Sequence, residues 1–349
     1  MLSPSEDITH HRFRVVEWTG ETIIRLVAFL SLAAILLILL FVFREAAPLF
    51  HPSEFAALDS SIYQASETYG EIEDDALSLG TSSTAGQGIY SAEVMTGDGV
   101  SGTFGSQWQP VSDRPKYGLA PLIIGSFKVT LIALLFAGPL GILSALFVTA
   151  FAPKALKGWL KPAVELLAGF PSVVIGFFAL TILASVLQTL LGLQFRLNAL
   201  TGGLALSLAV IPIIFTITED ALNAVPKSLS EASLALGASK WQTAVFVALP
   251  AATPGVLASL LLGFGRAFGE TMIVLMATGN AALLSLNPVE PVRTMSATIG
   301  AEMAEVVFGD IHYSVLFFIG VILFIVTFTI NGAAEFYVRQ RLRRRFGGG

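Results

Sequence analysis

The stretch LTGGLALSLAVIPIIFTI, residues 200–217, carries no charged side chain. A helix needs about 20 mostly apolar residues to cross the roughly 30 Å hydrocarbon core of a bilayer. Because the stretch has nearly that length, we predict that it is a transmembrane helix. Further runs of the same kind lie on both sides of it, at residues 26–43, 119–150, 164–190, 254–278 and 313–331. The sequence therefore predicts an all-α integral membrane protein with about six transmembrane helices.

The composition of the chain agrees with a membrane protein. Of its 349 residues, 54% are hydrophobic and 13% are charged, whereas soluble domains carry about 25% charged residues. The formal net charge is -5, but the acidic residues cluster between apolar runs, so we predict the lipid bilayer and no nucleic acid as a partner. The absence of cysteine excludes disulfides, thiolate metal sites and cysteine nucleophiles.

The histidines give no sign of a metal site. They show no metal-ligand spacing, and we interpret all of them as solvated loop residues: His10, His11, His51 and His312. We therefore expect no metal and no cofactor.

Two of the apolar runs allow more than one interpretation. The run 26–43 follows basic residues, as a secretory signal does, but its apolar core is longer than the usual 7 to 15 residues of a signal, so a retained helix is favoured. The run 119–150 exceeds one span and contains Gly138 and Pro139. Because proline removes a helical hydrogen bond, this run either bends there or includes an interfacial segment.

Lysine and arginine in the short connections predict the orientation of the helices. Basic residues between spans two and three, between spans four and five, and after span six mark the cytoplasmic side: Lys154, Lys157, Lys161, Lys227, Lys240, Arg339, Arg341, Arg343, Arg344 and Arg345. Acidic residues mark the opposite side: Glu67, Glu71, Glu73, Asp74, Asp75, Glu302, Glu305 and Asp310. Both termini are therefore predicted to be cytoplasmic.

These spans and loops divide the chain into four parts. Residues 1–45 are predicted to form a cytoplasmic N-terminus with the first helix, and residues 46–118 a polar, partly flexible extracytoplasmic loop. Residues 119–335 form a core of five transmembrane helices with a cytoplasmic loop at 218–250. Residues 336–349 form a basic cytoplasmic tail.

The cytoplasmic loop at 218–250 contains a helix start and a helix end. Ser228 and Glu231 fit a capping box, in which each side chain satisfies a free backbone N–H. Gly237 suits the left-handed residue that ends a helix. We predict a helix of about two turns, a sharp turn and a second helix leading into span five. So short a helix is marginal in water and needs something to pack against; an ordinary loop on the membrane surface is the alternative.

This loop resembles the EAA motif of ABC importer permeases, which is Glu-Ala-Ala, three residues, Gly, nine residues, and Ile-x-Leu-Pro. The matching positions keep the spacing of the motif: Glu231, Ala232, Ser233, Gly237, Val247, Leu249 and Pro250. Ser233 replaces alanine and Val247 replaces isoleucine. The resemblance implies the type I ABC importer permease fold and a coupling helix at residues 231–237 that docks on a cytoplasmic ATPase subunit.

Span five contains two charged residues, Arg266 and Glu270. A charged residue at the centre of a membrane costs about 2.5 to 3.5 kcal/mol on insertion scales and is expected to face a cavity or a partner. Glu270 lies four residues after Arg266, on the same face of a continuous helix, and could neutralise it. Either the pair holds helices together, or Arg266 faces a translocation path and offers a planar charged fork to an oxyanion.

The segments around these charges resemble the phosphate-specific (Pst-type) permeases, and the methionine at 272 resembles their C-type subunit. The resemblance extends over roughly residues 119 to 335 and includes 165–176, 211–214, 219–222, 266–272 and 277–280. It implies roles in phosphate transport for Arg266 and Glu270. Lys128 and Glu165 correspond less firmly: Lys128 either attracts anions or extends to the interface, and Glu165 lies at a membrane boundary.

No G-x-x-x-x-G-K-[ST] loop occurs in the chain, so we predict a transport subunit without its own ATPase site. The resemblance implies a bacterial inner-membrane importer of phosphate with two ATPase subunits, a second permease subunit and an extracytoplasmic phosphate-binding protein. Sulfate or molybdate is the alternative substrate. An ion-gradient-driven transporter, a channel and a receptor are the alternative classes.

Overall fold

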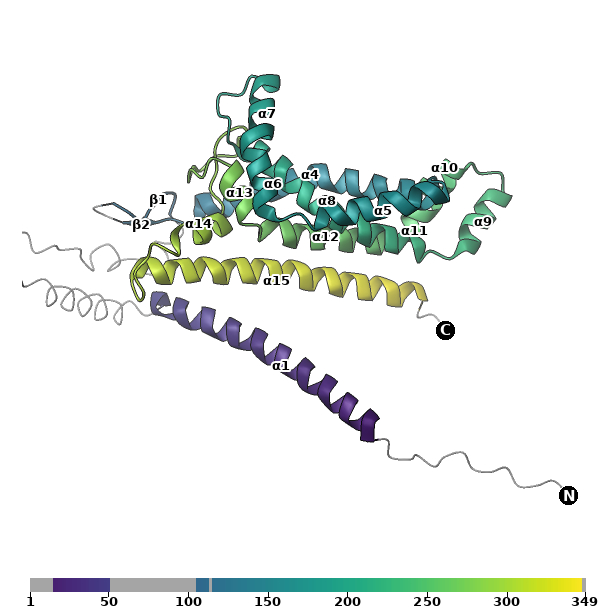
Figure 1. Ribbon diagram of the computed structural model, residues 1–349, viewed down its shortest axis with the longest axis horizontal. Helices are drawn as coiled ribbons and strands as arrows, with labels where there is room; N and C mark the ends of the chain where they lie inside the picture. Colours follow the sequence, from purple (N-terminus) through teal and green to yellow (C-terminus); the bar gives the residue numbers. More distant parts are fainter. Residues whose placement is uncertain (1–14, 51–104, 113–114, 347–349) are drawn as a thin grey trace, which may run out of the picture.

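The computed structural model describes residues 15–50, 105–112 and 115–346, and most of this part is helical (Figure 1). The first part of the chain contains α1 (Val15–Ala46), the 3-10 turn η1 (Ala47–Phe50), β1 (Trp108–Gln109), β2 (Lys116–Tyr117), α4 (Ala120–Ala150), α5 (Lys154–Ala168), α6 (Ser172–Phe178), the π-helical η3 (Ala179–Leu183) and α7 (Ala184–Leu191). The second part contains α8 (Ala199–Asn223), α9 (Lys227–Ala235), α10 (Lys240–Thr243), the π-helical η4 (Ala244–Ala248), α11 (Leu249–Ala251), α12 (Thr253–Phe268), α13 (Met272–Ala277), α14 (Met295–Glu302) and α15 (Ile311–Phe346).

The apolar helices confirm the predicted all-α membrane protein. Within the described ranges, five helices are long and apolar enough to cross a membrane, and a sixth span results if the bent pair Lys240–Ala251 and Thr253–Phe268 is counted as one. The helices α1, α4, α8 and α15 contain the runs predicted at 26–43, 119–150, 200–217 and 313–331. Pro139 lies inside α4, which is one continuous helix from Ala120 to Ala150.

The boundaries predicted for spans three and five are wrong. The third candidate span begins at Ser172 rather than at 164, because Pro171 has no N–H and the residues before it form the separate helix α5. The run 254–278 is two helices, α12 and α13, separated at residues 269–271. Uniform hydrophobicity could not reveal either interruption, because the interrupting residues are themselves mostly apolar or small.

Two long helices, α4 and α8, form the centre of the molecule and pack against each other over most of their length. Helix α12 packs on both of them, α15 packs on α12, and α1 packs on α15 (Figure 1). Large apolar side chains of α1 are exposed, among them Ile24, Phe29 and Leu37. Exposed apolar surface of this extent suits contact with lipid.

Figure 1 shows that the start of α1, the end of α15 and helix α9 lie toward one end of the bundle, whereas the hairpin of β1 and β2 lies at the other. In the hairpin Trp108 pairs with Tyr117 and Gln109 with Lys116. The hairpin lies within the predicted loop 46–118; residues 51–104, 113 and 114 of that loop lie outside the described part. Which end is cytoplasmic stays a prediction, with the hairpin end predicted to be outside.

Candidate functional site

The predicted coupling element, residues 231–237, lies mainly on α9. This nine-residue helix begins at Lys227 after Pro226, whose side chain cannot accept a capping hydrogen bond. The predicted capping box of Ser228 and Glu231 is therefore wrong, because Ser228 is already within the first turn. A capping box occurs instead at the start of α10, where Ser239 Oγ accepts from Gln242 N at 3.2 Å and Gln242 Oε1 accepts from Ser239 N at 2.8 Å.

Gly237 ends α9 as predicted, with a φ of 88°. Gly237 N donates to Leu234 O at 3.0 Å and Ala238 N donates to Ser233 O at 3.2 Å. These two hydrogen bonds form a Schellman motif, which satisfies carbonyls that the helix end would leave without partners. The turn fixes the direction in which the chain leaves α9 toward α10.

A hydroxyl pair joins the two helices of the loop. Ser233 Oγ lies 2.9 Å from Thr243 Oγ1, and Thr243 is buried. The serine that departs from the EAA pattern thus has a structural partner in this chain. Glu231, Ala232 and Pro250 are exposed, whereas Leu249 packs against a buried cluster that includes Phe215.

The outer surface of α9 carries apolar residues. Leu236 is 90% exposed, and Leu229 and Leu234 are also exposed. No residue of α9 is buried. A short helix with this surface, at the end of the bundle predicted to be cytoplasmic, has room for a partner to cover it.

Arg266 and Glu270 lie beside the interruption between α12 and α13. We predicted that the two residues lie on one continuous helix. That prediction is wrong, because α12 ends at Phe268. Their side chains still approach each other: Arg266 Nη2 lies 3.6 Å from Glu270 Oε2. The arginine side chain is 53% exposed, whereas the glutamate side chain is only 7% exposed. The carboxylate is therefore buried and the guanidinium is open on one side.

Exposed residues lie on both sides of this pair. On α12, Leu262 and Arg266 are exposed and four residues apart, whereas Phe264 and Phe268 on the other face are buried. Gly269 in the interruption and Met272 at the start of α13 are also exposed, and neither carries a charge. A donor at 3.6 Å is too distant for a good hydrogen bond, so Arg266 has capacity for another acceptor.

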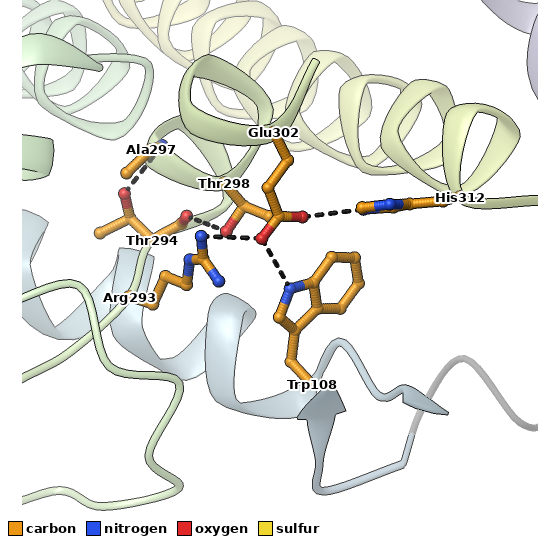
Figure 2. A network of polar contacts seen from close by, with 7 residues as sticks. All are labelled: Trp108, Arg293, Thr294, Ala297, Thr298, Glu302 and His312. Atoms are coloured by element: carbon orange, nitrogen blue, oxygen red, sulfur yellow. Dashed lines mark hydrogen bonds and ion pairs between the residues drawn. The ribbon is translucent and has the colours of Figure 1, made fainter. Parts of the chain in front are cut away.

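A polar network near the hairpin joins three parts of the chain (Figure 2). Glu302 Oε1 accepts from Arg293 Nη2 at 2.7 Å and from Trp108 Nε1 at 3.2 Å, and Glu302 Oε2 lies 2.9 Å from His312 Nε2. Burial alone would raise the pKa of the Glu302 carboxyl, but the hydrogen bond with His312, the charge of Arg293 and the hydrogen bond from Trp108 together hold it below its usual value.

His312 in this network corrects the sequence interpretation of that residue. It is the second residue of α15, its side chain is only 12% exposed, and it contacts Glu302 instead of lying in a solvated loop. The other three histidines lie outside the described residues. The network was missed because its members are far apart in sequence. Within the described ranges, no group of three or more His, Cys, Asp or Glu residues could hold a metal ion.

Two lysines, Lys128 and Lys161, form polar contacts with other elements of the structure. Lys128 on α4 is buried, and its Nζ donates to the carbonyls of Ser285 at 2.9 Å and Asn287 at 3.1 Å. It therefore does not extend to the interface. Lys161 on α5 forms an ion pair with Glu219 on α8 at 2.7 Å, and Glu219 also accepts from Asn223 Nδ2 at 2.7 Å. Glu165 is an exposed residue of α5 rather than of a span.

These features define a class of protein: a multi-pass helical membrane protein with a charged pair at an interruption of an apolar helix and a short exposed helix, α9, at one end. The chain belongs to the family of binding-protein-dependent transport system inner membrane components, whose family model matches residues 137–344. Family membership together with the apolar helices confirms the predicted importer-permease fold and the location in the bacterial inner membrane.

Individual relatives support the same assignment. The chain is 40% identical to a probable ABC transporter permease, YqgH of Bacillus subtilis, over 63% of this chain and 72% of the relative. It is 34% identical to the phosphate transport system permease PstC of Mesorhizobium japonicum, over 73% of this chain and 83% of the relative. Among solved structures it resembles an inward-facing MetNI methionine ABC transporter, with 21% identity, a TM-score of 0.47, and coverage of 62% of this chain and 90% of the other.

Proposed function

We propose that this permease subunit moves inorganic phosphate into the cytoplasm as part of an ATP-driven importer. The observation that carries the proposal is Arg266: a half-exposed guanidinium at an interrupted membrane helix, held at 3.6 Å by a buried carboxylate. The 34% identity to a phosphate transport permease over 73% of the chain supports phosphate as the substrate. The alternatives within the class are sulfate and molybdate.

Arg266 is proposed to receive the anion along the translocation path. A guanidinium presents two parallel N–H groups to a phosphate, which gives a strong and directional contact. Glu270 keeps that contact from becoming too tight, because its negative charge lies beside the site. A transporter must release what it admits, so a pair at 3.6 Å that can open and close serves the function better than a fixed one.

The proposed ATPase partners bind at α9. Its exposed leucines, Leu229, Leu234 and Leu236, offer an apolar surface to a cleft, and Gly237 sets the turn that transmits movement toward α10. Hydrolysis is assigned to two ATPase subunits. Closure of these subunits moves α9, and the bundle then exposes Arg266 alternately to the outside and to the cytoplasm.

A second permease subunit is assigned to the side of the bundle where α6, η3 and α7 extend. In Figure 1 helix α7 projects away from the long helices, and apolar side chains of this arm are exposed, including Phe177, Ile182 and Leu190. The outer end of the bundle, with the hairpin, is assigned to an extracytoplasmic phosphate-binding protein. Each partner is thus assigned to a separate part of the chain. The ATPase subunits contact the loop 218–250, the second permease subunit contacts the rest of the core 119–335, and the binding protein contacts the region 46–118.

The test is ATP-dependent uptake of radiolabelled phosphate by the reconstituted complex, with excess sulfate and molybdate as competitors. Arg266→Ala should abolish uptake, and Arg266→Lys should reduce it because the ammonium lacks the planar fork. Arg25→Ala is the matched control: Arg25 is an exposed arginine of α1, which packs on α15, and no partner subunit is assigned to that helix.

Three results would contradict the proposal. Normal phosphate uptake by an assembled Arg266→Ala complex would remove the arginine from the path. ATP-dependent uptake of labelled sulfate or molybdate, without uptake of phosphate, would keep the importer assignment and replace the substrate. Uptake driven by an ion gradient without ATP would exclude the importer mechanism itself.

A further inference from the structure

Helix α14 is a short, buried element between the interrupted span and the outer hairpin. Four consecutive residues at its start are buried: Met295, Ser296, Ala297 and Thr298. Thr294 caps the helix by accepting from Ala297 N at 3.2 Å, and Thr298 Oγ1 donates back to Thr294 O at 2.9 Å (Figure 2). A capped and buried helix of this kind is held firmly in one position.

The inner end of α14 contacts the interruption that carries Glu270. Ser296 Oγ donates to the backbone carbonyl of Glu270 at 2.7 Å. Glu270 belongs to neither α12 nor α13, so its carbonyl takes no part in the hydrogen bonds of either helix and needs a partner from elsewhere. A Cβ added at Gly300 would lie 2.6 Å from Thr271 Cγ2, so the helix and the interruption are in direct contact.

The outer end of α14 is held by Glu302. Its carboxylate binds Arg293 before the helix, His312 on α15 and Trp108 of the hairpin (Figure 2). The indole of Trp108 is buried and also meets the ring of Tyr117 edge-on at 5.9 Å. At 1.5 Å per residue, the six steps from Ser296 to Glu302 span about 9 Å of helix. A single rigid element thus connects the hairpin to the Glu270 carbonyl.

We propose that Ser296 and Glu302 are positioning residues for Glu270. Ser296 fixes the backbone of the interruption, and Glu302 fixes α14 against the hairpin and α15. The position of the Glu270 carboxylate beside Arg266 then depends on contacts at the outer face of the protein. This inference rests on the proposed function for its consequence in transport, but its structural part can be tested without transport.

The structural test is hydrogen exchange of the assembled transporter, followed in peptides that cover residues 265–275. Ser296→Ala should speed exchange of the amides at 269–273 about fivefold, the effect expected from one lost hydrogen bond. Trp108→Phe, which keeps an aromatic ring but removes the N–H, should cause a smaller increase at the same amides. Ser207→Ala is the matched control, because Ser207 is also buried and donates to a backbone carbonyl, Leu204 O at 2.6 Å.

Unchanged exchange at 269–273 in Ser296→Ala would overturn the proposal. An equal increase at these amides in Ser207→Ala would also overturn it, because the effect would then be general loosening. Glu302→Gln provides a second variant with the same expectation, since it keeps the size of the side chain and removes the charge that holds Arg293.

The functional test is a double-mutant cycle in the uptake assay. Ser296→Ala should lower the maximal rate of phosphate uptake about three- to tenfold, and in a Glu270→Gln background it should change the rate less than twofold, because the group it positions is gone. Independent, multiplicative losses would contradict positioning through Glu270. If Glu270→Gln itself transports phosphate normally while hydrogen exchange is faster in Ser296→Ala, the positioning of the interruption by Ser296 is supported. The proposed role of Glu270 in transport is then wrong.

Discussion

Replacing Gly237 by alanine tests the coupling helix most directly. The φ of Gly237 is 88°, and a Cβ built at this position would meet no atom within 4 Å. The substitution therefore causes no clash with a neighbour, and its cost comes from the backbone. A left-handed conformation costs an L-residue about 1–2 kcal/mol, and part of this is offset because alanine restricts the unfolded chain more than glycine does.

The net loss is about 1 kcal/mol, or roughly a fivefold drop in the equilibrium constant for forming the Schellman turn. We expect Gly237→Ala to lower phosphate uptake more than ATP hydrolysis, because the ATPase sites stay intact while α9 transmits their closure less often. Gly237→Asn should recover most of the coupling, since asparagine tolerates the left-handed region. The measurement is phosphate transported per ATP hydrolysed in proteoliposomes.

Gly192 is the matched control for this experiment. It has a φ of 62°, caps α7 at its C-terminal end and likewise has no atom within 4 Å of an added Cβ. Figure 1 shows that α7 lies away from α9. Gly192→Ala should leave the ratio of transport to hydrolysis unchanged. An unchanged ratio in Gly237→Ala, or an equal loss in both variants, would refute the reasoning that α9 couples through its C-terminal turn.

Three further predictions follow from contacts outside the translocation path. Because the pKa of Glu302 is lowered in the folded state, its ionised form stabilises the protein above pH about 4.5, and this stabilisation is lost as pH falls through the lowered pKa. Glu302→Gln should therefore remove this part of the pH dependence of the melting temperature. A pH profile of the melting temperature that is the same in Glu302→Gln would contradict the prediction. Ser233→Ala leaves the buried Thr243 hydroxyl without its partner and should destabilise the loop by about 1–2 kcal/mol, seen as faster proteolysis within 227–240. Lys161→Met should lower the free energy of unfolding by about 1–2 kcal/mol, less than for a fully buried ion pair because the lysine is 39% exposed. Adding Glu219→Gln to the same chain should restore most of the lost melting temperature, because no buried charge is then left without a partner.

The central features of the fold could be predicted from the sequence because they depend on local chemistry. A bilayer requires long uncharged helices, so residues 26–43, 119–150, 200–217 and 313–331 were located from their apolar length alone. The turn at Gly237 was predicted because only a residue that tolerates positive φ can end a helix in that way. The spacing of the EAA motif also located α9, although the residue expected to cap its start was wrong.

The interruptions of the helices could not be predicted from hydrophobicity. Hydrophobicity does not distinguish residues 169–171 from the run around them, although Pro171 is a local signal that separates α5 from α6. Residues 269–271 contain no proline, and there Ser296 of α14 contacts the Glu270 carbonyl. Arg266 and Glu270 were predicted to be neighbours on the basis of a continuous helix, and they are neighbours for a different reason. The interruption turns the Glu270 carboxylate into the protein and leaves the arginine exposed.

The sequence by itself determined the solvent of this protein, the number of its membrane helices and the residues that carry charge into them, because each of these depends on the length and polarity of a local segment. Only the tertiary structure decided what holds those charges in place. Trp108, Ser296, Glu302 and His312 come together from distant segments. Their contacts depend on how α14 and α15 pack against the hairpin and the interrupted span, which no local pattern records.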